Sequence, residues 1–232
     1  MTVFLTSSPT GDLDGKYQVS GLDNRSGFLD ELRSLWPEGA RCLMITAFPD
    51  DDAANDEMRS FFHNAVITSG LSCRCFNIFD GRTDLAMAES IPGYDVIFLG
   101  GGHVPTQREF FRRLRLRQRL KGFGGIIIGI SAGTMNCAED VYSMPELEGE
   151  SVDPAYERFF PGLGLTDINI IPHYQMTYGT YLDGKRLYED IILPDSAGRR
   201  FLCLPDGSYV CVRDGEAAIH GPHRWIVDGE FE

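Results

Sequence analysis

Short apolar runs alternate with amphipathic stretches along most of the chain, and Gly, Pro or Asp marks most of the changes between them. Strands are expected at 3–5, 42–48, 73–79, 95–99, 125–130 and 168–172, and helices at 27–35, 109–120 and 134–139. A further helix is expected to start at Asp50-Asp51-Asp52. Its buried face would carry Met58, Phe61, Phe62, Ala65 and Val66 at helical spacing. The alternation predicts an α/β fold with a doubly wound, mostly parallel sheet and helices on both faces.

The last forty residues have a different pattern. Four short apolar runs, 201–204, 208–212, 217–219 and 225–227, follow one another closely and are separated by Asp-Gly pairs. Asp-Gly turns favour antiparallel hairpins, so these runs are predicted to be extra antiparallel edge strands of the same domain. Neither an internal repeat nor a flexible linker is visible, which predicts a single domain over residues 1–232.

Composition and charge exclude several classes of protein. The chain has 232 residues, 43% of them hydrophobic, and its 21 Lys and Arg against 34 Asp and Glu give a net charge of −13. Such a charge repels phosphate backbones and anionic lipid, so neither nucleic acid nor a membrane is an expected partner. The start of the chain lacks the basic lead and apolar core of a secretory signal, and a cytoplasmic location is expected. Six cysteines lie mostly in strand-like runs, as structural thiols do, and no metal is expected.

The segment Gly129-Ile130-Ser131-Ala132-Gly133 lies between the apolar strand 125–130 and the helical stretch 134–139. This is the context of a nucleophile elbow, in which a sharp turn presents the serine hydroxyl and the flanking glycines avoid a clash. The N–H groups at the start of the helix, Ala132 among them, would stabilise negative charge on a substrate oxygen. Ser131 is therefore a candidate nucleophile. The alternative is a turn of small residues that only lets the helix pack closely on the sheet.

A second glycine cluster, Gly100-Gly101-Gly102-His103, follows the strand 95–99. In a parallel sheet its loop opens on the same edge as Ser131, so the Gly102 N–H would complete an oxyanion hole with that of Ala132. A phosphate or dinucleotide loop is less favoured, because neither GxGxxG nor GxxxxGK[ST] is present. No cofactor is expected.

A nucleophilic serine needs a base, which is usually His, and a carboxylate that orients the imidazole. His173 directly follows the apolar strand 168–172, and in such a sheet ligand sites lie at the carboxyl ends of the strands. Asp206 follows the run 201–204 in the same way. His173 is the candidate base and Asp206 the candidate acid, although Pro205-Asp206-Gly207 is equally typical of an ordinary turn.

Together these features resemble peptidase family S51, the serine hydrolases that include dipeptidase E (aspartyl dipeptidase) and the cyanophycinases. The resemblance runs from residue 95 to the C-terminus and is carried by DVIFLGGG, GISAG, Met144-Pro145, LGLTDINIIPHY and FLCLPDGSYV. It implies a class I glutamine-amidotransferase-like fold, with Ser131 as nucleophile and His173 as base. Asp206 stands where many members carry Glu.

The resemblance also indicates which residues meet the substrate. Gly101, His103, Gln107 and Arg186 are expected to line the pocket, although relatives have Asn where this chain has His103. Arg186 is suited to pair with a substrate carboxylate through two hydrogen bonds, and a solvated helix residue is the alternative. Ser143 stands before the Met-Pro pair, where some members have an acidic residue.

Other arrangements are less favoured. An ordinary α/β-hydrolase has the order Ser, acid, His. In this chain it would need Asp153 or Asp167 as acid and His220 or His223 as base. An amidotransferase needs a thiol in the elbow, and Cys137 lies too far into the following helix.

The basic stretch 112–121 places leucines among arginines at helical spacing. A solvated face, ion pairs with the acidic residues 50–56, or a contact in a homodimer would each explain it without nucleic acid. The expectation for the whole chain is a serine peptidase that cleaves small peptides, including dipeptides with an N-terminal Asp. The alternatives are a non-catalytic binding module, or an esterase, amidase or isopeptidase that uses the same site.

Overall fold

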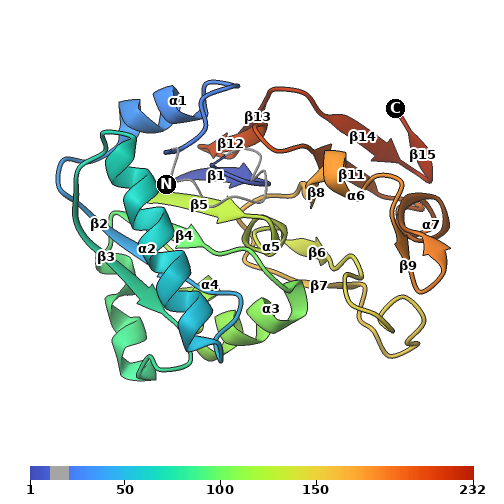
Figure 1. Ribbon diagram of the computed structural model, residues 1–232, viewed down its shortest axis with the longest axis horizontal. Coiled ribbons are helices and arrows are strands. Elements are labelled where there is room, and N and C mark those ends of the chain that lie inside the picture. The colour runs from blue at the N-terminus through green and yellow to red at the C-terminus, as the bar shows by residue number, and fades with distance from the viewer. Residues whose placement is uncertain (11–20) are drawn as a thin grey trace.

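In the computed structural model, which describes residues 1–10 and 21–232, a seven-stranded sheet forms the centre of the molecule (Figure 1). Its strand order is β13-β12-β1-β5-β4-β2-β3, and the five strands from β1 to β3 in that order are parallel. They are β1 (Thr2–Thr6), β2 (Ala40–Ile45), β3 (Cys73–Phe79), β4 (Val96–Leu99) and β5 (Ile126–Ile130). Strand β2 ends three residues earlier than expected, so Phe48 lies in the loop that follows it.

Helices cover both faces of this sheet. One apolar cluster joins α1 (Phe28–Leu35) and α2 (Asp52–Thr68) to the face that carries Val96 and Phe98. The other joins η1 (Leu85–Gly93), α3 (Val104–Arg113) and α4 (Leu116–Arg119) to the face that carries Ile97 and Leu99. Alternate residues of β4 thus enter different cores, as a strand buried on both sides requires. The expected doubly wound α/β architecture is confirmed.

Helix α2 begins and buries its face as its sequence indicates. The Asp51 carboxylate caps the helix by accepting a hydrogen bond from the Ala54 N–H at 3.0 Å. Of the five expected inward residues, Phe62, Ala65 and Val66 are buried, while Met58 and Phe61 are partly buried against the same cluster.

The basic stretch does not form the single helix expected over 109–120. Helix α3 ends at Arg113, and Arg115 has a left-handed backbone conformation (φ 50°) before α4 begins. Leu114 and Leu116 are both fully buried, and residues two apart cannot lie on the same face of a continuous helix. The break at Arg115 lets both leucines enter the core.

The extra antiparallel strands expected near the C-terminus are present, and they divide between two sheets. Strands β12 (Tyr209–Arg213) and β13 (Glu216–His220) form a hairpin on the free edge of β1, with Asp214 and Gly215 at φ 52° and 82° in its turn. Strands β11 (Arg200–Leu204), β14 (Arg224–Val227) and β15 (Glu230–Phe231) instead join β8 (Asn169–Pro172) in a second sheet, ordered β15-β14-β11-β8. Asp206-Gly207 is therefore a connection from one sheet to the other, not a hairpin turn.

Short elements complete the second half of the chain. Helix α5 spans only Ala132–Met135, shorter than the expected 134–139, and packs beneath the second sheet, with Ala132 and Ile171 in one apolar cluster. The other elements are β6 (Asp140–Tyr142), β7 (Phe159–Pro161), α6 (Tyr174–Thr177), β9 (Tyr181–Leu182), β10 (Lys185–Arg186), η2 (Leu187–Ile192) and α7 (Leu193–Asp195). None of the helices in the described part of the chain combines the length and apolar character needed to cross a bilayer.

Candidate active site

Ser131 lies at the turn between β5 and α5 in a backbone conformation that a residue with a side chain seldom adopts, at φ 50° and ψ −111°. The last residue of β1 holds this turn, because the Ser131 N–H donates to the Thr6 carbonyl at 3.0 Å. The buried hydroxyl of Thr134 donates to the same carbonyl at 2.7 Å. Such strain persists where the surroundings fix it, and it is concentrated at functional sites.

The two glycines of the elbow are needed for close packing. A Cβ atom on Gly129 would lie 2.8 Å from the Thr134 hydroxyl oxygen and 2.9 Å from the Thr134 Cα atom. A Cβ atom on Gly133 would lie only 2.1 Å from the carbonyl oxygen of Leu99, in the neighbouring strand β4. The GxSxG spacing therefore has a steric cause in this structure. Ser131 itself stays partly exposed at the turn.

His173 and Asp206 form a hydrogen-bonded pair at the end of the second sheet. Strands β8 and β11 are parallel with Pro172 opposite Leu204, so the residues that follow them emerge at the same edge. The Nδ1 atom of His173 lies 2.7 Å from Oδ1 of Asp206, whose side chain is only 3% exposed. This contact is made by Nδ1, so Nε2 is the ring nitrogen that is suited to accept a proton. The His173 backbone, like that of Ser131, has a positive φ (56°).

Strand β1 connects the elbow with the His173–Asp206 pair. Thr6 accepts the hydrogen bond from the elbow, and the hydroxyl of Ser7, the next residue, donates to the Leu204 carbonyl at 2.6 Å. In Figure 1 the arrows of β1 and β5 point toward the side where β8 and β11 lie. Within residues 1–10 and 21–232, no hydrogen bond joins the Ser131 hydroxyl to the His173 ring. Catalytic hydrogen bonds are often long in unliganded enzymes and shorten when substrate binds.

The glycine loop after β4 lies against the elbow. A Cβ atom on Gly101 would be 3.4 Å from the Cβ atom of Ser131. Gly102 has φ 145°, which only glycine adopts readily, and a Cβ atom there would lie 2.5 Å from the ring of Phe48. The structure thus brings this loop and the start of α5 together beside Ser131, so their N–H groups are suited to bind a substrate oxygen.

Gln107 lies behind the glycine loop and not in a pocket. Its side chain is fully buried, where its amide nitrogen donates to the Gly100 carbonyl at 2.7 Å. Its amide oxygen accepts from the Asn136 amide at 3.0 Å. A buried side chain offers no surface to a substrate, so Gln107 supports the loop, in contrast with the direct contact expected from the sequence.

His103 and Arg186 already have partners within the protein. The His103 ring lies 2.8 Å from the Thr106 hydroxyl through Nδ1 and 2.7 Å from a Glu150 carboxylate oxygen through Nε2. Arg186 is exposed and forms a two-point ion pair with Asp190, at 3.0 and 2.7 Å. In the described part of the chain no hydrogen bond or ion pair joins either residue to the His173–Asp206 pair, and Arg186 would have to leave Asp190 to bind a substrate carboxylate.

The residues that an ordinary α/β-hydrolase or an amidotransferase would use have other partners in this structure. The His220 ring stacks on Tyr209 with its centroid 4.5 Å away, and Nδ1 of His223 is 3.0 Å from the Gly221 carbonyl. Cys137 is buried, and its surroundings raise the pKa of its thiol well above the usual value. The thiol therefore stays protonated and inaccessible.

Sequence reasoning missed Thr6, Ser7 and Phe48. Thr6 is the last residue of β1, Ser7 follows it, and Phe48 follows β2, so the rule that singled out His173 would also have pointed to these strand ends. Thr6 and Ser7 appear as ordinary polar residues after a short strand, and Phe48 appears as the last apolar residue of a longer one.

A strained serine elbow at the end of β5 and a His–Asp pair at the end of the second sheet are groups of the kind that hydrolytic enzymes use. The model of peptidase family S51 matches residues 46–220. The chain therefore belongs to peptidase family S51 and is a peptidase.

A solved structure supports the fold. The chain is similar to the crystal structure of a candidate peptidase E protein from Listeria monocytogenes EGD-e, with a TM-score of 0.61 and 18% sequence identity. The alignment covers 94% of this chain and 96% of the other, so the likeness extends over the whole architecture. No curated protein matches the sequence at a significant level.

Proposed function

We propose that the chain is a serine peptidase that hydrolyses small peptides through Ser131, His173 and Asp206. One observation carries the proposal: a strained, partly exposed serine elbow is tied through β1 to the edge where His173 and Asp206 lie 2.7 Å apart. Family membership supports peptide bonds as the target.

In the first half of the reaction, the Ser131 hydroxyl oxygen attacks the peptide carbonyl carbon and His173 Nε2 takes the hydroxyl proton. Asp206 fixes the ring so that Nδ1 carries a proton and Nε2 can accept one. The N–H groups of Gly102 and Ala132 stabilise the negative charge that develops on the carbonyl oxygen. When the C–N bond breaks, His173 passes the proton to the departing amine.

In the second half, water attacks the acyl group on Ser131 and gives a proton to His173. The ester bond then breaks, the Ser131 oxygen regains that proton, and the new carboxylic acid leaves and releases its own proton to solvent. Each step uses side chains and backbone groups of the chain itself, and His173 returns to its starting state after each turnover.

The resemblance to dipeptidase E makes dipeptides with an N-terminal Asp the first substrates to test. In this structure the cationic residue expected to meet them, Arg186, is paired with Asp190. A dipeptide panel that varies the N-terminal residue therefore measures whether the side chain of Asp is recognised, separately from whether peptides are cleaved.

The test of the proposal replaces Ser131 with Ala. The Ser131→Ala variant should keep its melting temperature and lose at least about 10³-fold in kcat, because the remaining groups bind but do not attack. The matched control is Ser60→Ala, on the exposed side of α2, where the hydroxyl only donates to the Asp56 carbonyl. Turnover by the Ser131→Ala variant at the wild-type rate would reject the serine mechanism.

A further inference from the structure

Phe48 is a large aromatic residue that the protein leaves 41% exposed directly beside the glycine loop. It lies three residues after β2, on the edge of the sheet where the site is. Its ring fills the space that a Cβ atom on Gly102 would occupy, with Cε2 and Cζ 2.5 and 2.6 Å from that position. Because Gly101 lies against Ser131, the glycine loop contacts the Phe48 ring at one residue and the candidate nucleophile at the residue before it.

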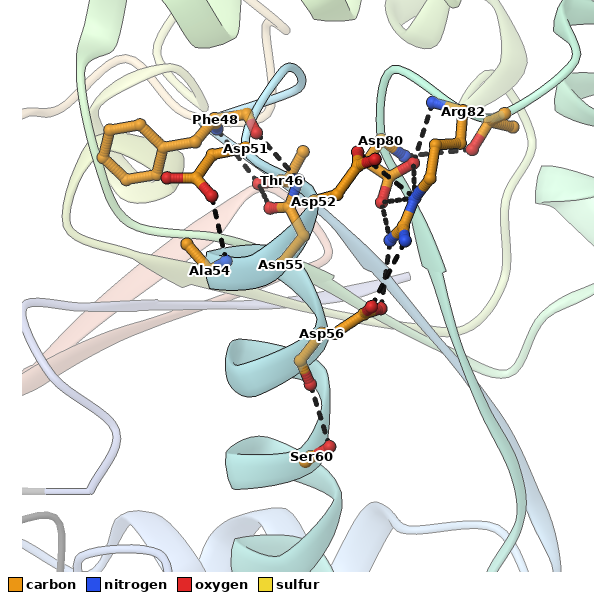
Figure 2. Close-up of polar contacts among 11 residues, drawn as sticks. Thr46, Phe48, Asp51, Asp52, Ala54, Asn55, Asp56, Ser60, Asp80 and Arg82 are labelled. Atoms are coloured by element: carbon orange, nitrogen blue, oxygen red, sulfur yellow. Dashed lines mark hydrogen bonds and ion pairs between the residues drawn. The ribbon is translucent and has the colours of Figure 1, made fainter.

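Two buried polar side chains hold the backbone of Phe48. The Phe48 N–H donates to the Thr46 hydroxyl at 3.0 Å, and the Asn55 amide nitrogen donates to the Phe48 carbonyl at 2.8 Å. The Thr46 hydroxyl in turn donates to the Asn55 amide oxygen, which closes a ring of hydrogen bonds (Figure 2). Thr46 and Asn55 are both 0% exposed. Burial of such groups is costly unless they are hydrogen-bonded, and here their bonds hold one exposed residue in place.

The same loop is anchored from its other side. The Gly81 N–H, after β3, donates to the Pro49 carbonyl at 2.7 Å. The Arg82 guanidinium binds the carboxylates of Asp52, Asp56 and the buried Asp80, so it connects the loop after β3 with the start of α2 (Figure 2). The Phe48 ring is therefore exposed on a fixed backbone. An aromatic side chain with few rotatable bonds loses little entropy when another group packs on it.

From this geometry we infer that Phe48 is a specificity-determining residue of the peptidase, whose ring receives an apolar or aromatic side chain adjacent to the scissile bond. The inference rests on the proposed function, because it takes Ser131 and the Gly102 N–H to mark the position of the reacting carbonyl. Thr46 and Asn55 are positioning residues that act through Phe48. Arg82 is matched by three carboxylates, and Asp50 and Asp51 lie in the same loop, so the surroundings disfavour an acidic side chain against the ring.

The experiment measures kcat/KM for two dipeptide series, X-Ala and Ala-X, with X being Phe, Leu, Ala, Lys or Asp. The wild-type protein should prefer Phe and Leu over Ala in at least one series. The Phe48→Ala variant should lower kcat/KM for those peptides by about tenfold or more and leave the corresponding Ala-Ala value within about twofold. The matched control is Ile67→Ala, an apolar residue with a similar exposure (50%) near the C-terminal end of α2. Equal losses for all peptides, or no apolar preference in either series, would overturn the inference.

Substitution of Thr46 tests the positioning role. The Thr46→Val variant keeps the shape of the side chain but removes the hydroxyl that holds the Phe48 N–H. It should raise KM for Phe and Leu peptides several-fold with kcat preserved, whereas Thr46→Ser should restore wild-type KM. An unchanged KM in the Thr46→Val protein would contradict this role. So would a KM in the Thr46→Ser protein that is raised as much as in the Thr46→Val protein.

Binding to the Ser131→Ala protein separates the two hypotheses. Calorimetry with Phe-Ala and with Ala-Phe should give at least about tenfold weaker binding of one of the two peptides when Phe48→Ala is added to Ser131→Ala. If no peptide is cleaved but this difference is present, the serine mechanism fails and the role of Phe48 stands. If peptides are cleaved and the difference is absent, the mechanism stands and the role of Phe48 fails.

Discussion

The elbow depends on the absence of a side chain at Gly133, and its replacement by Ala tests that dependence. The added Cβ atom would lie 2.1 Å from the Leu99 carbonyl oxygen, whereas real Cβ atoms essentially never come within 3.0 Å of such an atom. The clash is with backbone, so α5 and β4 must separate by about 0.9 Å. Overpacking of this kind costs about 3 kcal/mol, which corresponds to a fall of roughly 6–12 °C in melting temperature for a chain of this size. A displacement near 1 Å beside a reacting group also lowers kcat about 10²-fold.

Differential scanning calorimetry and peptide hydrolysis measure these two effects. Gly124→Ala is the matched control, because a Cβ atom on Gly124 has no neighbour within 4 Å. This control should keep its melting temperature within a few degrees and its full activity. A Gly133→Ala protein that is as stable and active as the Gly124→Ala protein would refute the steric account of the elbow.

Three further predictions concern the site and its surroundings. Replacing Asp206 with Asn should lower kcat about 10³–10⁴-fold with little change in KM, while Asp206→Glu, which keeps the carboxylate on a longer side chain, should lose far less. Arg186→Ala should change kcat/KM for Asp-containing dipeptides less than about threefold in steady-state assays, because Arg186 is exposed and bound to Asp190. Iodoacetamide should leave activity unchanged, and mass spectrometry should find Cys137 unmodified, because burial raises the pKa of its thiol.

A different result would contradict each of these three predictions. A fully active Asp206→Asn protein would show that the Asp206 carboxylate has no part in the mechanism. A tenfold or larger loss confined to acidic peptides in Arg186→Ala would show that Arg186 leaves Asp190 to bind substrate. Alkylation of Cys137 with loss of activity would point to a thiol at the centre of the site.

Local sequence patterns were sufficient to predict the parallel strands of the central sheet and helices on its faces. Strand β4 is four apolar residues whose alternate side chains enter different cores, and α2 follows its helical stripe and its Asp51 cap. The break at Arg115 was not visible, because it follows from the burial of both Leu114 and Leu116 in the folded core. The second sheet was not visible either, since the pairing of β8 with β11 joins segments that are distant in the sequence.

The candidate site, like the fold, was predictable from the sequence only in part. Ser131 is recognisable because its strand, its glycines and its following helix are contiguous in the sequence, and the proximity of His173 to Asp206 follows from both residues lying at strand ends. The surroundings of Gln107 and Arg186 were not predictable, because they depend on Asn136 and Asp190 as partners. Phe48 was missed because an apolar residue after an apolar strand looks like part of that strand until its exposure is known.

Labelling with a fluorophosphonate followed by peptide mapping tests the central claim most directly, because this reagent reacts readily only with an activated serine. The account predicts one adduct, on Ser131 and on no other residue. It also predicts labelling at least about 10²-fold slower in a folded His173→Ala protein, which has lost its base. The absence of an adduct on Ser131, or an equal labelling rate without His173, would contradict it.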